Sequence, residues 1–236
     1  MRIQTRPIAS GAIAALLTIV LTVVLTIASH NAMAASTSGF RLRADMIPVS
    51  CNVSLSDNGT VDFGVIRAQD LKATAYTNVG YKTVSLTLTC DAAAKVAVTA
   101  SDGRKGTVAS GVGKFLYGNQ NDASMFGVGS IDGKNIGAYI IYREDTPTAD
   151  GKAARAIFSN DGGASWYDRY DANNAIIPDT RLHGWAAATG DVAPGSFVSI
   201  TQQYKIRLGL NSKDKLPSLT RDIPIDGLAT FTVTYL

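Results

Sequence analysis

Alternating apolar and polar residues mark three long extended segments of the chain. They lie at residues 81–90, 198–210 and 229–235, and Gln202 is the one polar residue at an inward position of the second run. Because successive side chains of a strand point to opposite faces of a sheet, this period of two predicts half-buried strands. No convincing amphipathic helix and no internal repeat accompanies them. The pattern predicts an all-β sandwich, and a closed barrel is the alternative.

Shorter segments complete the predicted domain. Residues 101–130 are rich in glycine and are expected to form a loop. Residues 168–195 are polar and irregular, so we expect them to form a long surface excursion with Trp185 as its anchor. The domain prediction is one sandwich over residues 48–236 with a long loop-rich insertion around 101–195. Residues 61–66 form a short apolar segment, and further short strands are predicted at 96–100, 136–142, 153–158 and 165–167.

A separate alternating stretch precedes the domain, within residues 35–47. It follows a leader rich in Ser, Thr and Gly, and it predicts a strand that ends before Pro48. A strand at such a position needs a sheet to pair with. It could pair within its own subunit or with a neighbouring one, and the period alone fits both. The apolar residues Phe40, Leu42, Ala44 and Met46 alternate there with Arg41, Arg43 and Asp45.

The first 34 residues have the features of an export signal. Arg2 and Arg6 precede an apolar run from Ile8 to Ala28, and Ala32-Met33-Ala34 fits a small-x-small cleavage site. The run is also long enough to be an uncleaved membrane anchor, which is the alternative. We expect residues 1–34 to be removed during export through the periplasm.

Cys51 and Cys90 are the two cysteines of the chain. In an oxidising compartment the simplest expectation is that they pair with each other. Metal binding would need more ligands than two thiols and His183 supply, so no metal site and no cofactor is expected. A disulfide between Cys51 and Cys90 is therefore predicted.

Composition and charge narrow the choice of partners. The net charge is +3, and about +1 without Arg2 and Arg6. Nucleic-acid binding needs a clustered cationic surface, so no such partner is expected. Of the 19 acidic residues only Glu144 is glutamate, and there are 22 glycines. Because aspartate and glycine favour turns, this composition supports short strands joined by tight turns.

Two groups of residues carry a resemblance to a known family. The second cysteine ends a Val-x-Leu-x-Leu strand, and the chain finishes in an alternating run, Gly227–Leu236, with tyrosine at the penultimate position. This arrangement resembles the pilin subunits of the chaperone–usher pathway. The segments Gly59–Gly64 and Leu86–Asp91 are similar to fimbrial-like exported proteins catalogued only as a domain of unknown function.

The resemblance implies an immunoglobulin-like sandwich that lacks its last strand. It implies a non-enzymatic subunit of a fimbria at the cell surface, which serves adhesion and has as partners other pilus subunits, a periplasmic chaperone and an outer-membrane usher. A neighbour's arm would fill the open groove. By this resemblance Phe40, Leu42, Ala44 and Met46 are donor residues, and Phe231, Val233 and Tyr235 line the groove and the chaperone contact. An ordinary core strand is the alternative for these last three, and both roles can hold together.

A free-standing carbohydrate-binding or glycoside-hydrolase-like module is the alternative from another class. Residues 159–166 resemble the Asp-box hairpin of sialidases, which is a turn closed by Asp161 with Trp166 packed beneath it. His183 is expected to be a solvated loop histidine, and no Gly-x-Ser-x-Gly motif accompanies it. The aromatic residues suit either a sugar-stacking surface or a second small core, and they are Trp166, Tyr167, Tyr170 and Trp185.

Overall fold

The computed structural model describes residues 41–118, 121–144, 147–168 and 175–236. The chain divides into two compact units, Met1–Met46 and Ile47–Leu236, and all strands of the described residues belong to the second. The export signal predicted for residues 1–34 and the roles predicted for Phe40 and Tyr170 lie outside the described residues. Within those residues, no helix combines the length and the apolar character needed to cross a membrane.

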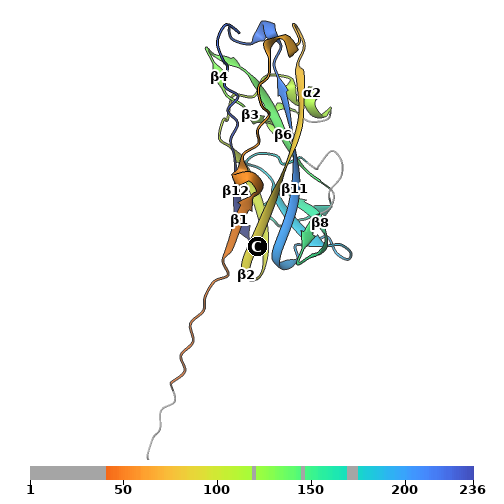
Figure 1. Cartoon of the computed structure of the whole chain (residues 1–236). Coiled ribbons are helices and arrows are strands. Elements are labelled where there is room, and N and C mark those ends of the chain that lie inside the picture. The colour runs from red at the N-terminus through yellow and green to blue at the C-terminus, as the bar shows by residue number, and fades with distance from the viewer. Residues whose placement is uncertain (1–40, 119–120, 145–146, 169–174) are drawn as a thin grey trace, which may run out of the picture. The chain divides into compact units, whose positions relative to one another are not determined.

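The second unit is built almost entirely of β-strands, which confirms the predicted all-β fold class (Figure 1). The strands are β1 (Cys51–Leu55), β2 (Thr77–Asp102), β3 (Phe126–Gly127), β4 (Ser130–Ile131), β5 (Lys134–Asn135), β6 (Gly137–Arg143), β7 (Thr148–Ala149), β8 (Lys152–Ser159), β9 (Tyr167–Asp168), β10 (Leu182–Ala187), β11 (Ser196–Leu210) and β12 (Ala229–Tyr235). The helices are α2 (Val112–Tyr117) and 3-10 turns at Ser56–Gly59, Ala68–Asp70, Asp122–Ser124 and Lys213–Lys215.

The long strand β2 belongs to both layers of the sandwich. Its first part pairs antiparallel with β1 on one edge and with β11 on the other. Beyond Lys95 the strand pairs with β12 and β10 instead. β6 and β3 extend the first layer, and β8 and β9 extend the second. The sharp bend of β2 between its two parts is visible at the bottom of Figure 1.

Strand pairing runs around the molecule and leaves one gap. Starting at β1, the pairing passes through the first part of β2 to β11, then β7, β8, β10, the second part of β2 and finally β12. β1 and β12 are the two ends of this path, and they do not pair with each other. Full barrel closure, the alternative considered above, is therefore not reached at this one place.

The predicted inward faces form the core. On β2 this face is buried throughout, from Val84 to Cys90, and on β11 it is buried from Ile200 onward. Val198, predicted to face inward, is 42% exposed, so the buried face of β11 begins later than expected. Gln202 is buried because its polar atoms are bonded: its Oε1 accepts from Trp185 Nε1 (3.2 Å), and its Nε2 donates to the Glu144 carbonyl oxygen (3.0 Å).

Two expectations for the middle of the chain are wrong. Residues 168–195 are not a surface excursion throughout, because β10 lies inside them and Trp185 is 1% exposed. The residues of β10 are buried on both faces of the sheet, so the sequence there does not alternate between apolar and polar residues. Residues 101–130 are not only loop, since Val112–Tyr117 form the helix α2 and bury Leu116.

The predicted disulfide is confirmed. Cys51 and Cys90 are directly opposite each other in the pairing of β1 with β2, and their sulfur atoms are 2.05 Å apart. The bond closes a loop with a sequence separation of 39 residues. In the chain-entropy view, such a loop contributes on the order of 4 kcal/mol to stability.

The predicted arm strand is not formed by the described residues 41–50, which are in neither helix nor strand. Leu42 is 83% exposed and Met46 is 97% exposed. A strand is held by hydrogen bonds to a neighbouring strand, so an alternating sequence stays irregular when it has no partner.

Candidate functional site

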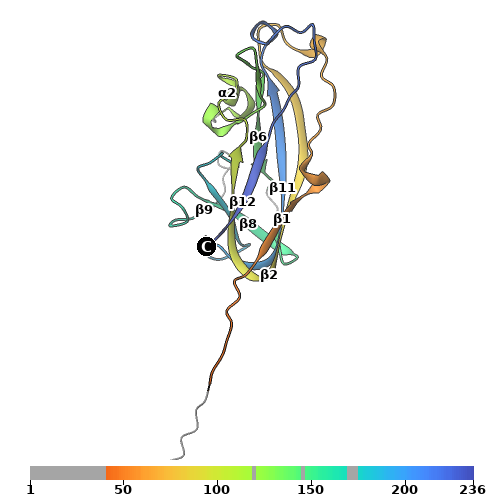
Figure 2. The ribbon, with the colours of Figure 1, turned by 90° about the vertical axis from the view of Figure 1, so that its left-hand side faces the viewer.

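An apolar groove runs between β1 and β12, where strand pairing is interrupted. Figure 2 shows the molecule from this side. The registers put the start of β1 and the end of β12 close to the bend of β2, since Cys51 pairs with Cys90 and Tyr235 pairs with Val96. We call this the shared end of the two strands. In chain order β1 runs away from the shared end, whereas β12 runs towards it. The two strands that border the groove are therefore antiparallel to each other.

Four hollows follow the groove in order from the shared end. The first lies beside Val53 and Phe231, and the second, of about 200 Å³, is lined by residues that include Phe63 and Ala229. The third lies between residues 61–66 and 222–225, and the fourth reaches Leu71 and has about 330 Å³. Each hollow shares lining residues with the next, so together they form one continuous groove.

The groove exposes the side of the hydrophobic core. The apolar residues that pack on the core there are only partly buried, whereas their neighbours in β2, β6 and β11 are fully buried. Phe231 stacks on the buried ring of Tyr204, with ring centroids 5.3 Å apart. Those partly buried residues are Val53, Leu55, Val61, Phe63, Ile66, Leu219, Ile223, Ala229, Phe231 and Val233.

The strand edges that face the groove are also unpaired. β1 and β12 each pair on one edge only, with β2, and in the described residues no backbone hydrogen bond joins residues 53–66 to residues 221–231. Unpaired strand edges beside apolar side chains are the features that an added β-strand requires.

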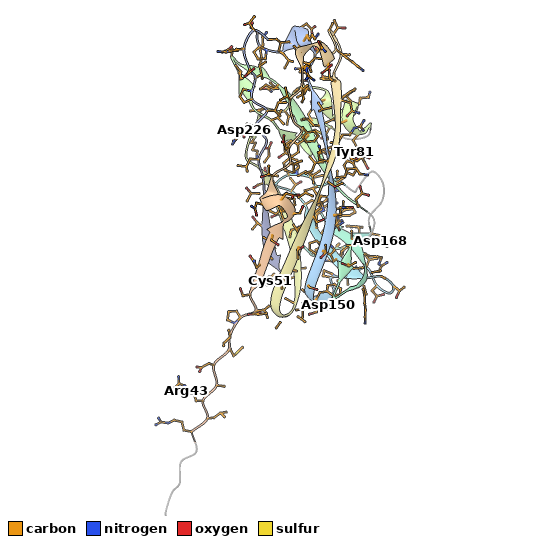
Figure 3. All side chains as sticks on the ribbon, in the orientation of Figure 1. Arg43, Cys51, Tyr81, Asp150, Asp168 and Asp226 are labelled. Atoms are coloured by element: carbon orange, nitrogen blue, oxygen red, sulfur yellow. A yellow bond between two sulfur atoms is a disulfide. The ribbon has the colours of Figure 1, made fainter. Side chains whose placement is uncertain are left out.

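The shared end of the groove is closed by a side chain. The backbone N–H of Cys51 donates a hydrogen bond of 2.7 Å to the Tyr235 hydroxyl oxygen. The disulfide ties β1 to β2 at the same level, and Asp91 Oδ1 accepts the N–H of Ser50 at 2.9 Å. Figure 3 marks Cys51 where β1 begins and Asp226 on the segment that leads into β12. The groove therefore has a fixed width where β1 begins.

Gly227 is a groove residue that the sequence pattern did not identify. A Cβ atom there would come within 2.6 Å of the Tyr139 ring, so glycine lets the backbone lie directly on the core. Tyr139 itself is buried, and burial raises the pKa of its hydroxyl. The signal in the sequence is weak because a single glycine before a strand is common.

The predicted groove residues differ in their surroundings. Phe231 and Val233 are partly buried and pack against the core. Tyr235 is half exposed, and its hydroxyl holds Cys51. The three therefore lie along one strand that borders the groove, and their role in binding a chaperone stays a prediction. The same holds for the donor role of Leu42, Ala44 and Met46, which are exposed in the arm.

The residues predicted for sugar stacking do not form one surface. Trp185 is buried, so it has no free face, and its role as a sugar contact is wrong. Trp166 lies over Gly184, where an added Cβ would be 2.8 Å from the ring. Its Nε1 donates to the Gly163 carbonyl oxygen at 3.0 Å. Tyr167 is 49% exposed.

The turn at residues 159–166 has the geometry expected from its sequence. Asp161 Oδ1 accepts hydrogen bonds from the Ser159 hydroxyl (2.7 Å) and the Ser165 N–H (2.9 Å). These bonds, led by the one from Ser159, lower the pKa of Asp161 to about 2. The carboxylate is thus occupied in holding the turn.

His183 is not the solvated loop residue that was expected. It is fully buried in β10, opposite Phe158 and Val98. Burial first, and then the nearby cations Arg143 and Arg181, lower the pKa of His183 well below its ordinary value. No alternation marks β10 in the sequence, because its residues are buried on both faces, so its histidine resembles a loop residue.

Comparisons with known proteins give one family and two relatives. A family model described as a protein of unknown function, DUF1120, matches residues 40–140, which include residues 40–47 of the arm, β1 and β2. Uncharacterized protein YhcF of Escherichia coli (strain K12) is 27% identical over 146 residues, which cover 57% of this chain. The match spans 61% of that relative's length. Protein GltF of the same strain is 26% identical over 242 residues, covering 90% of this chain and 94% of GltF.

These similarities agree with the expected likeness to a domain of unknown function. The matched region of the family model ends within β6 and so does not include β11 or β12. The resemblance to pilins stays a prediction.

Proposed function

We propose that this chain is a structural subunit of a surface fibre, a fimbria that serves adhesion. In this proposal the chain is exported through the periplasm, a chaperone fills the groove first, and the arm of a neighbouring subunit then replaces it. An outer-membrane usher would bring the subunits together. The observation that carries the proposal is the continuous apolar groove between two strands that have no partner on that side.

The size of the groove supports an extended segment as its occupant. The lining runs from Val53 to Leu71 on one side and from Leu219 to Phe231 on the other. A row of hollows of this kind accepts alternate side chains of one strand, while the backbone of that strand pairs with the free edges. A small ligand would need one enclosed pocket with converging polar groups instead.

The arm has the properties of such a segment. Leu42 and Met46 are almost fully exposed, and apolar residues alternate with charged ones around them. Burying three or four apolar side chains contributes up to roughly 5 to 10 kcal/mol before the cost of ordering the arm. An exposed alternating segment and an unfilled groove are both unfavourable alone, and strand donation satisfies the two together.

A free-standing sugar-binding module is less well supported. Of the aromatic residues predicted for its binding surface, Trp185 is buried in the core and Trp166 packs on β10. Within the described residues Tyr167 is then the one half-exposed ring of the predicted set. Strand donation therefore remains the function that the geometry favours.

The test replaces a donor side chain in the full chain. Leu42→Asp and Met46→Asp are expected to abolish assembly when the chain is co-expressed with a pilus chaperone, because a carboxylate cannot be buried in an apolar hollow. The melting temperature is expected to stay unchanged, because the side chains of Leu42 and Met46 are exposed and not part of the core. Size-exclusion chromatography with light scattering measures assembly. Met46→Leu, which keeps an apolar side chain, is the matched control.

Two results would contradict the proposal. One is a wild-type chain that stays monomeric and stable without any strand-lending partner, and that loses nothing when residues 36–47 are deleted. The other is unfolding of the domain by Leu42→Asp, which would mean that the arm pairs within its own subunit.

A further inference from the structure

The part of the groove farthest from the shared end of β1 and β12 has a deep apolar floor. The fourth hollow, of about 330 Å³, shares Val65, Ile66 and Ile223 with the third, of about 390 Å³. We call these two hollows together the distal pocket. Both volumes lie within the range of small-molecule sites. The floor of the fourth hollow consists of the buried residues Leu71, Ile136, Leu210 and Leu216.

The rim of the distal pocket exposes apolar side chains to water. Val65 is 88% exposed, which is the largest fraction among the described large apolar side chains of residues 47–236. Ile225, which also lines both hollows, is partly exposed. Because covering such side chains removes apolar surface from water, the rim and the floor together favour an apolar occupant.

The charges of the distal pocket are separated along its length. Two guanidinium groups, Arg67 and Arg221, border the fourth hollow. Arg67 has no ion pair within the described part of the chain, and Arg221 is held by Asp132 at 3.0 Å in a pair that is more than half exposed on both sides. The third hollow is bordered instead by Asp62 and Asp222. A carboxylate is therefore attracted to the fourth hollow and repelled from the third.

We propose that the distal pocket binds a free fatty acid, with the carboxylate beside Arg67 and Arg221 and the acyl chain on the apolar floor. An acyl chain differs from a compact small molecule, because it can lie extended along an open groove. The inference goes beyond the proposed function and does not depend on strand donation, since the lining residues all belong to the domain itself.

Calorimetric titration of the full chain with dodecanoate, below the concentration at which it forms micelles, tests this inference. Octanoate is expected to bind at least about tenfold more weakly, because four fewer methylene groups are buried. Dodecanol and dodecyltrimethylammonium keep the chain but lack the negative charge, so they are expected to bind about tenfold more weakly than dodecanoate. Added salt should reduce this preference for dodecanoate, since exposed charges are screened.

Substitutions at the rim should change dodecanoate binding in opposite directions. Arg67→Gln is expected to weaken it about threefold, and R67Q/R221Q about tenfold, because exposed ion pairs are lost. Asp222→Asn is expected to strengthen it about threefold, because a repelling carboxylate is removed. Dodecanol should bind these variants as it binds the wild type. Lys152→Gln, at an exposed position of β8, is the control and should leave both affinities unchanged.

Thermal unfolding of each variant checks that the fold is kept. R67Q/R221Q also loses the exposed pair between Arg221 and Asp132. Arg67→Gln removes no ion pair of the described residues, so this single variant keeps the test valid if the double variant is less stable.

Three results would overturn the inference. The first is a wild-type chain that does not bind dodecanoate. The second is equal affinity for dodecanoate and dodecanol, because the carboxylate would then not be recognised. The third is dodecanoate binding that R67Q/R221Q and Asp222→Asn leave unchanged, because the ligand would then lie in another part of the groove. Opposite shifts in Arg67→Gln and Asp222→Asn, seen with dodecanoate and not with dodecanol, would support it.

Discussion

Where β7 lies between β8 and β11, backbone hydrogen bonds connect the two layers of the sandwich, whereas between β1 and β12 there are none. The closed side is held by a tight turn in which Asp150 and Gly151 have φ angles of 51° and 73°. The open side is held at one end by the disulfide and by Tyr235. The same sandwich therefore completes one side with its own backbone and leaves the strand edges of the other side unpaired.

The two sides also differ in their buried chemistry. Behind the closed side lie buried polar residues, among them Arg143, His183 and Gln202. Arg143 donates to the carbonyl oxygens of Gly184 (3.1 Å) and Ile157 (3.0 Å), which ties β6 to β10 and β8. The open side is lined mainly by apolar residues. The bonded groups of Arg143 and Gln202 favour one internal arrangement, whereas both ring nitrogens of His183 lack a hydrogen-bond partner among the described residues.

The largest expected effect comes from the covalent bond on the open side. Cys51→Ala/Cys90→Ala is expected to lower the free energy of unfolding by about 4 kcal/mol, because the unfolded chain regains the entropy of the closed loop. Urea denaturation measures the change. The same variant is also measured with an arm peptide bound in the groove. The peptide should restore part of the lost free energy of unfolding, because it pairs with β1. A loss below about 1 kcal/mol would mean that β1 is held by pairing alone.

Lowering the pH is expected to reduce the free energy of unfolding through His183, which lies on the closed side. Because the pKa of His183 is lowered in the folded chain, folded and unfolded states are both neutral there above about pH 6.5. Below that pH the unfolded chain takes up a proton that the folded chain does not, so stability falls as the pH falls towards the folded pKa. The loss at pH 5 is at most about 2 kcal/mol, since one proton contributes about 1.4 kcal/mol per pH unit.

Replacing the histidine separates this effect from other titrations. His183→Leu is expected to make the free energy of unfolding less dependent on pH between 5 and 7, measured by urea denaturation. An unchanged slope in this variant would assign the acid sensitivity to other groups. The affinity of the open side for an arm peptide should not change between pH 5 and 7.

The turn at β7 should be the next most sensitive position. Asp150 Oδ1 accepts the N–H groups of Val198 (3.0 Å) and Ser199 (2.8 Å). Asp150→Ala is expected to cost about 1.5 kcal/mol, because it removes these bonds and puts alanine at a positive φ. Asp150→Asn, which tolerates that φ and keeps an acceptor, should lose less. Equal losses in Asp150→Ala and Asp150→Asn would show that neither the hydrogen-bond acceptor nor the tolerance of a positive φ stabilises the turn.

Much of the fold could be predicted because it depends on local alternation. The inward faces of β2 and β11, the final strand and the cysteine pair follow from side-chain period and from the number of cysteines. β10 could not, since a strand buried on both faces has no period. The dipeptide Asp150-Gly151 is a hairpin signal, and it forms the turn between β7 and β8.

The candidate site was only partly predictable. The resemblance to pilins predicts Phe231 and Val233 at its border; Phe231 lines two of the hollows, whereas Val233 packs on the core and lines none of the four. The other wall consists of Val61, Phe63 and Ile66 in an irregular segment, which no strand pattern identifies. Whether a groove is open depends on the tertiary path of such segments, and that path is not encoded in short-range periodicity.

The smallest effect concerns the end of the groove at Tyr235. Tyr235→Phe removes the hydrogen bond from the Cys51 N–H and is expected to cost about 1 kcal/mol, because the bond is partly exposed and water can replace it. Its more specific result should be faster hydrogen exchange at the Cys51 amide, with little change in the strands beside β7. Tyr81→Phe, at an exposed tyrosine of β2, is the control and should leave that amide unchanged. If exchange at Cys51 is the same in both variants, the disulfide alone fixes the width of the groove there. If it accelerates only in Tyr235→Phe, the tyrosine hydroxyl helps to fix the Cys51 backbone at this end of the groove.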